Sequence, residues 1–141
     1  MKKKRIEDIT SPSAKKAITS SHQKFDKTIS VNGCFGSSDL GQMSSAVSIE
    51  IRNRVPNAFM RCPFALYPEV EGPGQTIMHD DYQIVIDGCK DRCLKKTLEK
   101  AGIKVDLSYA LDEDFGLEKH PQPTPFNRED MLLVAKTISH W

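Results

Sequence analysis

One short run of residues, from Tyr82 to Asp87, limits the fold more than any other part of the chain, because its centre reads Ile-Val-Ile without a polar break. A strand with one face in water alternates apolar and polar residues. An unbroken apolar centre is typical of a strand covered on both faces, as in a parallel sheet with helices on either side. Residues 88–90 then turn the chain, and leucines four positions apart predict a helix over about 91–101, which Gly102 ends.

The rest of the chain continues this alternation of strands and helices. Asp39, with Gln42 three residues later, is predicted to be the N-cap of the longest helix. Asn127 is predicted to cap the last helix. In chain order, the remaining predicted elements are a strand over 28–33, an amphipathic helix over 39–54, a strand over 58–62, a short helix beginning at Pro73, a strand over 103–107 at a sheet edge, a loop over 112–126 and a helix over 128–139.

This order predicts an α/β fold: a small three-layer parallel sheet of about four strands in the order 2-1-3-4, flavodoxin-like or Rossmann-like, with a C-terminal helix. We expect residues 27–141 to form a single domain. Residues 1–26 are expected to form a basic N-terminal arm with a short helix over about 13–20.

The charge of the chain is balanced overall, because 20 Lys and Arg residues face 19 Asp and Glu residues among 141. A globally basic nucleic-acid binder is therefore excluded. We interpret the basic arm as a solvated tail rather than as a segment that contacts nucleic acid or anionic lipid. No apolar run approaches the roughly 20 residues of a membrane helix, and no signal-peptide core follows the basic start. We therefore expect a cytoplasmic protein without a membrane partner; no protein partner or oligomeric state can be read from the sequence.

The four cysteines fall where predicted strands end. Cys34 follows the first strand, Cys62 closes the second, Cys89 follows the third, and Cys93 lies in the first turn of the next helix. The carboxyl ends of parallel strands meet at one edge of a sheet, where ligands commonly bind. We therefore predict that the four thiols converge there. In a reducing compartment, disulfides are not expected, and the alternatives are core packing, metal binding or redox chemistry.

Four convergent thiolates suit a tetrahedral zinc ion or an iron–sulfur cluster. Zinc is favoured because the cysteines come from separate elements, whereas iron–sulfur sites usually take three cysteines from one loop. Asp87 and Lys90 are candidate supporting groups next to the ligands, the first as an acceptor and the second as a positive charge. Of the four histidines, His120 is the one placed to approach the site from its loop.

A second hypothesis is a thiol enzyme for redox chemistry, sulfur transfer or metal delivery, with Cys34 as its reactive group. The loop after Cys34 is rich in glycine and serine, which leaves room for a substrate. A phosphatase-like Cys-x₅-Arg motif is absent, because Leu40 occupies the sixth position after Cys34. We favour the non-enzymatic zinc-binding domain, and no catalytic residue is assigned.

The run Val85-Ile86-Asp87-Gly88-Cys89, followed by Cys93, resembles the DGC-domain family, which is named for its Asp-Gly-Cys triplet. Two further motifs agree: the loop and helix start at 34–42, and Asp114-Phe115-Gly116-Leu117-Glu118-Lys119. The resemblance covers about residues 28–119. It implies a zinc site formed by Cys34, Cys62, Cys89 and Cys93, and it implies no established reaction. The chain departs from the family after Cys62, where Pro63 to Pro68 replaces a glycine-rich loop.

Overall fold

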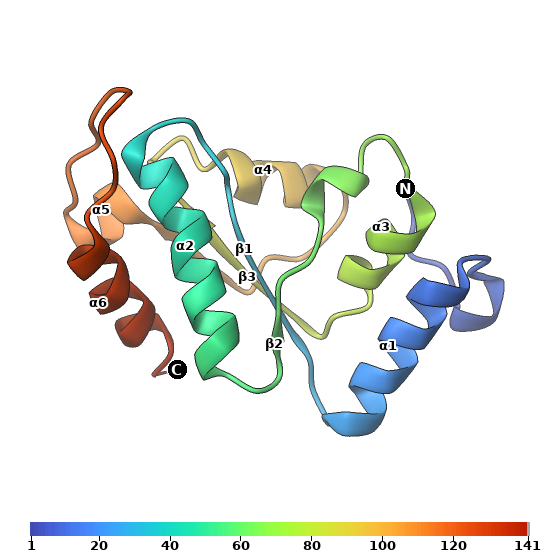
Figure 1. Cartoon of the computed structure of the whole chain (residues 1–141). Coiled ribbons are helices and arrows are strands. Elements are labelled where there is room, and N and C mark those ends of the chain that lie inside the picture. Colours follow the sequence, from blue (N-terminus) through green and yellow to red (C-terminus); the bar gives the residue numbers. More distant parts are fainter. Residues whose placement is uncertain (141) are drawn as a thin grey trace.

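The computed structural model describes residues 1–140. Its centre is one four-stranded sheet in which every pair of neighbouring strands is parallel (Figure 1). The strand order, β2-β1-β3-β4, confirms the predicted order. The strands are β1 (Ile29–Gly33), β2 (Ala58–Phe59), β3 (Tyr82–Asp87) and β4 (Leu107–Ala110).

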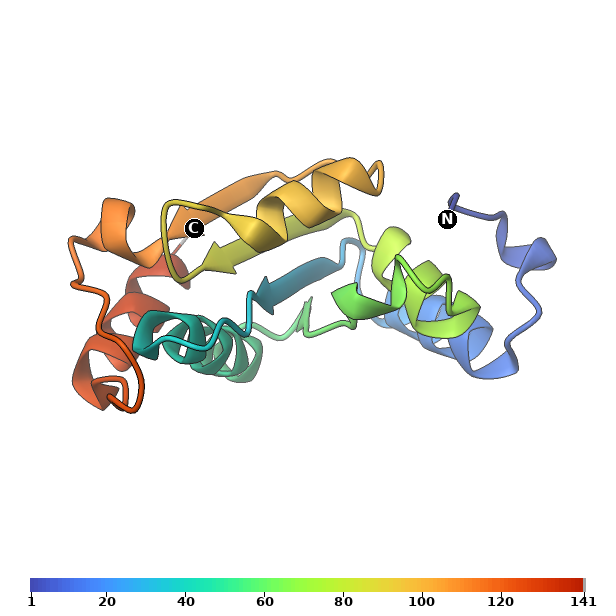
Figure 2. The ribbon, with the colours of Figure 1, turned by 90° about the horizontal axis from the view of Figure 1, so that it is seen from above.

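Helices cover both faces of this sheet, which gives the three predicted layers. Figure 2 shows α2 on one side of the strands and α4 on the other. The helices are α1 (Pro12–Lys24), α2 (Asp39–Arg54), α3 (Glu71–Met78), α4 (Cys93–Lys100), α5 (Leu111–Phe115) and α6 (Arg128–Ile138), with two 3₁₀ turns at η1 (Ile6–Asp8) and η2 (Pro63–Ala65). None of these helices is long and apolar enough to cross a membrane.

The strand β3 is buried on both faces, as its sequence predicts. Successive side chains of a strand point to opposite faces. Ile84 and Ile86 accordingly join the apolar cluster under α2 and α6, while Val85 joins the cluster under α3 and α4. All three residues are at most 3% exposed. This one strand therefore belongs to both halves of the core.

The predicted boundaries of two strands are wrong. The edge strand lies at Leu107–Ala110 rather than over 103–107, because Ile103 packs into the cluster under α4 and ladder pairing with β3 begins only at Leu107. The strand β2 ends at Phe59 rather than at residue 62. There the Arg61 N–H bonds to the side-chain Oδ1 of Asn32 at 2.9 Å, which ends the backbone ladder.

The helices α2 and α6 begin at the predicted residues, but one of the two predicted N-caps is wrong. Ser38, and not Asp39, is the N-cap of α2, where its Oγ accepts the N–H of Gly41 at 3.2 Å. The predicted cap of α6 is confirmed, because Asn127 accepts the N–H of Asp130 at 3.0 Å. The predicted loop over 112–126 also contains most of α5.

The N-terminal arm is folded onto α3 rather than free in solvent. Its helix α1 extends over Pro12–Lys24, longer than the predicted 13–20. Glu71 of α3 accepts the backbone N–H groups of Thr10 and Ser11 at 2.8 and 2.9 Å. The fully buried amide of Gln75 bonds the Lys4 N–H and the Lys2 carbonyl, both at 2.8 Å. The arm is thereby fixed to α3 by hydrogen bonds from both ends of its first ten residues.

We predict that Gly33→Ala lowers the free energy of unfolding by about 1–3 kcal/mol, the usual cost of overpacking. A Cβ on Gly33 would lie 2.5 Å from the backbone of Ser44 and Ser45 in α2, so the helix could not approach β1 as closely. Gly36→Ala is the matched control, because its Cβ would meet nothing closer than 3.4 Å. Urea unfolding of both variants measures the difference, and equal midpoints would contradict the prediction.

Candidate cysteine site

Three of the four cysteines line one pocket. Cys34, Cys89 and Cys93 lie around a cavity of about 250 Å³ at the carboxyl ends of β1 and β3, beside the first residue of α4. Cys62 is exposed and lines a different hollow, of about 500 Å³, between α1, α3 and the segment after β2. The structure therefore brings together three of the four predicted ligands and places the fourth elsewhere. We call the first cavity the cysteine pocket.

The pocket has donors of the right chemistry for zinc, since three soft thiols line it. The side chains are not gathered around a single centre, however. Within residues 1–140, no three His, Cys, Asp or Glu side chains form a group that could hold a metal ion. Binding of an ion in the cysteine pocket would therefore require the thiols to turn toward one another.

Close backbone contacts between glycines build the floor of the pocket. A Cβ on Gly41 would lie 2.5 Å from the backbone of Gly36, and a Cβ on Gly88 would lie 2.6 Å from the backbone N of Gly41. The start of α2 can therefore rest directly on the loops that follow β1 and β3. The loop and helix start at 34–42 and the Asp-Gly-Cys triplet, which are separate motifs in the sequence, meet at this contact.

Cys34 is the cysteine held most closely by the backbone. Its Sγ lies 3.4 Å from each of the N–H groups of Gly36 and Gly88, and 3.4 Å from the Ser44 hydroxyl. The Cys34 N–H in turn donates to Ser44 Oγ at 3.1 Å. Backbone N–H groups directed at an acceptor stabilise negative charge on it. The half-buried sulfur of Cys34 thus faces the pocket in a fixed position.

The other two pocket thiols differ in exposure, since Cys89 is half-buried like Cys34 and Cys93 is exposed. Cys89 Sγ lies 3.7 Å from Asp91 Oδ2 and 3.8 Å from Lys119 Nζ, and Cys93 is exposed. Lys119 ends the Asp-Phe-Gly-Leu-Glu-Lys run, to which the sequence alone assigned no role. Its ammonium group brings positive charge to the thiols from a loop about 30 residues away in the chain.

Asp87 supports the site through helix α4. Its carboxylate is 1% exposed and accepts the backbone N–H groups of Leu94 at 2.9 Å and Lys95 at 3.2 Å, so it caps the helix that carries Cys93. Burial raises the pKa of Asp87, although these hydrogen bonds act in the opposite direction. Lys90, the other predicted supporting group, has an exposed side chain, and its backbone N–H donates to Asp112 at 3.1 Å.

A buried carboxylate and a histidine form a pair that the sequence did not predict. Asp39 accepts His120 Nδ1 on one oxygen and the His120 backbone N–H on the other, both at 2.8 Å. His120 lies in a neighbouring hollow that shares Ser37, Ser38 and Lys119 with the cysteine pocket. Burial acts to raise the pKa of Asp39, but the bonds from His120 and Leu40 outweigh it, so this pKa is lowered. The bond to Asp39 raises the pKa of His120.

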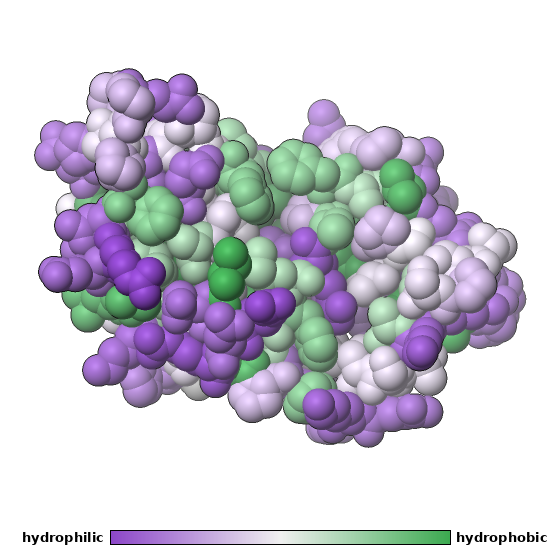
Figure 3. Space-filling view, viewed as in Figure 1, coloured by the Kyte–Doolittle hydropathy of each residue, from purple (hydrophilic) through white to green (hydrophobic). Residues whose placement is uncertain are grey.

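Exposed apolar side chains gather on residues 63–70, the segment after Cys62. Phe64, Tyr67 and Val70 are each at least half exposed. Figure 3 shows apolar surface over this part of the molecule, between β2 and α3. Cys62, at the start of this segment, therefore faces different surroundings from the other three cysteines.

We predict that His120→Gln destabilises the protein more at pH 6 than at pH 9. A histidine whose folded pKa is raised contributes its full stability below its ordinary pKa of about 6.5. That contribution is lost as the pH rises through the raised value, while Asp39, with its lowered pKa, stays ionised throughout. Thermal unfolding at both pH values gives the difference from wild type. Exposed His140→Gln is the control, and a difference independent of pH would contradict the prediction.

Comparison with known proteins places this arrangement in a family. The family model for the DGC domain matches residues 30–138. This range includes all four cysteines and all four strands, apart from the first residue of β1. No curated protein and no solved structure matches the chain. The resemblance seen in Asp87-Gly88-Cys89 is confirmed by a match over most of the sequence. The chain therefore belongs to the DGC domain family.

Proposed function

We propose that the protein binds zinc in the cysteine pocket through Cys34, Cys89 and Cys93. The observation that carries this proposal is the placement of three thiols, from two strand ends and one helix start, on the walls of one small cavity. Zinc is favoured over an iron–sulfur cluster because these ligands come from separate rigid elements rather than from a single loop. Three protein ligands leave one position of a tetrahedral zinc ion for water or another ligand.

The surrounding residues have roles in such a site. Asp87 holds the start of α4, and therefore the backbone of Cys93, in place. The N–H groups of Gly36 and Gly88 fix the sulfur of Cys34. Lys119 offsets part of the negative charge that three thiolates would bring together. Cys62 would have to leave its own hollow to become a fourth ligand, so the four-cysteine set is the alternative that the experiment tests.

We expect protein purified without oxygen to be colourless and to contain about one zinc ion per chain. Cys34→Ser, Cys89→Ser and Cys93→Ser should each lower the zinc content strongly, whereas Cys62→Ser should retain it. Metal analysis by mass spectrometry measures all four variants beside wild type. If Cys62→Ser loses zinc as fully as the others, the site has four ligands. If no cysteine variant loses zinc, or if iron and sulfide are found, the proposal is contradicted.

A second candidate function is thiol chemistry at Cys34, in redox reactions, sulfur transfer or metal delivery. The specific observation is that, within residues 1–140, the Cys34 sulfur alone among the four lies against two backbone N–H groups, in a loop rich in glycine and serine. Such groups stabilise a thiolate, which is the nucleophilic form of cysteine. Zinc bound to Cys34 would block redox reactions and sulfur transfer at that thiol, so reactivity is tested on metal-free protein.

We predict that metal-free protein reacts with iodoacetamide faster at Cys34 than at Cys62. Cys62 is the more exposed thiol, but no backbone N–H group is bonded to it in the described structure. Brief labelling followed by peptide mass spectrometry gives the relative rates. Labelling that simply follows exposure, with Cys62 and Cys93 ahead of Cys34, would contradict this prediction and leave zinc binding as the better account of the pocket.

A further inference from the structure

The N-terminal arm is held against α3 by three side chains that follow one another at intervals of four residues. They are Glu71, Gln75 and His79, and this spacing places them along one side of the helix. Glu71 and Gln75 bind the arm as described above, and His79 adds a third contact, because its ring Nε2 donates to the Lys4 carbonyl at 2.8 Å. His79 is the C-cap of α3, so this contact lies at the end of the helix. We call the three side chains the arm clasp.

One member of the arm clasp changes its charge near neutral pH. Gln75 has no ionisable group. Hydrogen bonds from Lys4 and Thr10 lower the pKa of Glu71 to about 2, so its carboxylate stays ionised in mild acid. An imidazole ordinarily titrates near pH 6.5. His79 is therefore the contact of the clasp through which mild acid can act on the arm.

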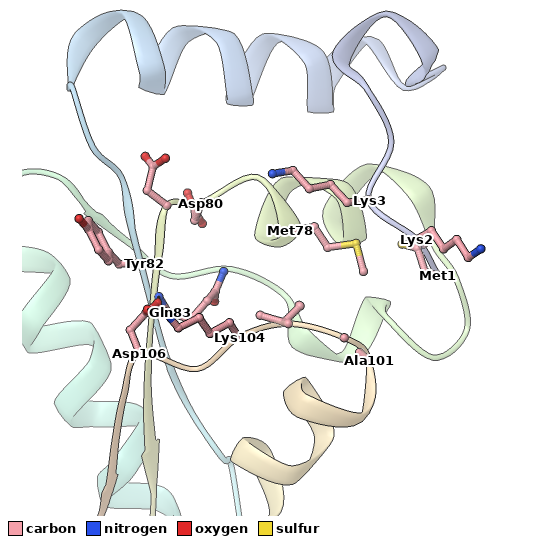
Figure 4. A pocket seen from close by; sticks show the side chains of 13 residues that line it. Met1, Lys2, Lys3, Met78, Asp80, Tyr82, Gln83, Ala101, Lys104 and Asp106 are labelled. Atoms are coloured by element: carbon pink, nitrogen blue, oxygen red, sulfur yellow. Dashed lines mark hydrogen bonds and ion pairs between the residues drawn. The ribbon is translucent and has the colours of Figure 1, made fainter.

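His79 lies in a hollow that collects positive charge as the pH falls. The hollow has a volume of about 430 Å³ between the arm, α1 and the start of β3, and its charged or titratable lining residues are Lys3, His22, His79 and Asp81. Figure 4 shows the Lys3 side chain extending from the arm past the end of α3. With both histidines protonated, three positive groups would line the hollow together with the one carboxylate of Asp81.

The two carboxylates next to His79 in the chain already have partners. Asp81 accepts the Thr28 N–H at 2.8 Å and lies 3.3 Å from His22 Nε2. Asp80 is bound by Arg61 through two bonds of 2.7 and 2.9 Å. Each carboxylate therefore offsets the positive charge of another side chain, and a proton added to the His79 ring lacks an acid of its own.

His79 is accordingly harder to protonate while the arm is attached than after the arm has left. Burial lowers the pKa of His79, and the charges of Lys3 and His22 act in the same direction, against the bond to Lys4 and the charge of Asp80. A histidine whose pKa is lowered in this way contributes its full stability above its ordinary pKa of about 6.5. That contribution is lost as the pH falls from there through the lowered value. Mild acid therefore favours the detached arm.

We propose that the first residues of the N-terminal arm are an acid-sensitive strap, which loosens from α3 when His79 becomes positive beside Lys3 and His22. Loosening would free the amide of Gln75, which is fully buried and bonds the arm at both of its ends. The strap is separate from the cysteine pocket and does not depend on the function proposed there. It also precedes residue 30, where the match to the family model begins.

The test is hydrogen exchange of the full chain at pH 7.5 and pH 5, measured by mass spectrometry on residues 1–11 and corrected for the intrinsic exchange rate at each pH. Protection of this segment should be lower at pH 5, by about tenfold for each unit by which the pKa of His79, measured by NMR titration, lies below its ordinary value. The buried strand β3 is the internal reference and should keep its protection at both pH values.

Three variants separate the charge of His79 from its hydrogen bond. His79→Gln can still donate to the Lys4 carbonyl but cannot become charged, so the arm should be equally protected at both pH values. Lys3→Ala removes one positive charge from the hollow and should make the loss of protection at pH 5 smaller. Exposed His140→Gln is the control and should behave as wild type.

Equal protection of the wild-type arm at both pH values would overturn the proposal, as would a pH dependence that persists in His79→Gln. Loss of protection in β3 at pH 5 would also overturn it, because acid would then unfold the domain rather than release the strap. His79→Gln could weaken the arm at every pH, so the ratio between the two pH values is compared rather than the protection itself. An undiminished ratio in Lys3→Ala would contradict the role given to charge in the hollow.

Discussion

Burial of β3 on both faces is the constraint on which the rest of the structure depends. A strand with Ile84 and Ile86 in one apolar cluster and Val85 in the other requires a helical layer on each side. Parallel neighbours then follow, because the connections carry those helices across the faces. The same constraint aligns the carboxyl ends of β1 and β3, and it is this alignment that brings Cys34 and Cys89 to one pocket.

Because the strand ends are aligned, the backbone segments around the pocket lie so close together that some positions have room only for glycine. The start of α2 and the loops after β1 and β3 are in backbone contact at Gly36, Gly41 and Gly88, where a Cβ on Gly41 or Gly88 would overlap the opposing chain. Because the backbones approach this closely, their N–H groups reach the Cys34 sulfur directly. The Asp-Gly-Cys triplet thus combines three physical tasks: Asp87 caps α4, Gly88 permits the contact, and Cys89 provides a thiol.

The sequence predicts the sheet order and most helices because those depend on local patterns: an unbroken apolar run in β3, leucine spacing in α4, and Asn127 as a cap. It places the edge strand too early because Ile103 alternates like a strand residue but packs under a helix. The three pocket thiols could be predicted, Cys34 and Cys89 from strand ends and Cys93 from a helix start. Cys62 could not be placed, because β2 has only two ladder residues and the chain leaves the sheet before reaching it. The pair Asp39–His120 joins residues 81 positions apart, and no local pattern signals it.

The two halves of the core also determine what a metal could contribute to stability. Small zinc domains are unfolded without metal because they bury little else. Here both faces of β3 are covered by apolar clusters formed without any cysteine ligand except Cys34, which packs at the edge of one of them. Closing the pocket around an ion would move the side chains of Cys89 and Cys93 rather than the sheet, since Cys34 is already fixed by backbone contacts. Metal bound there would therefore add its stability by mass action to that of the two apolar clusters.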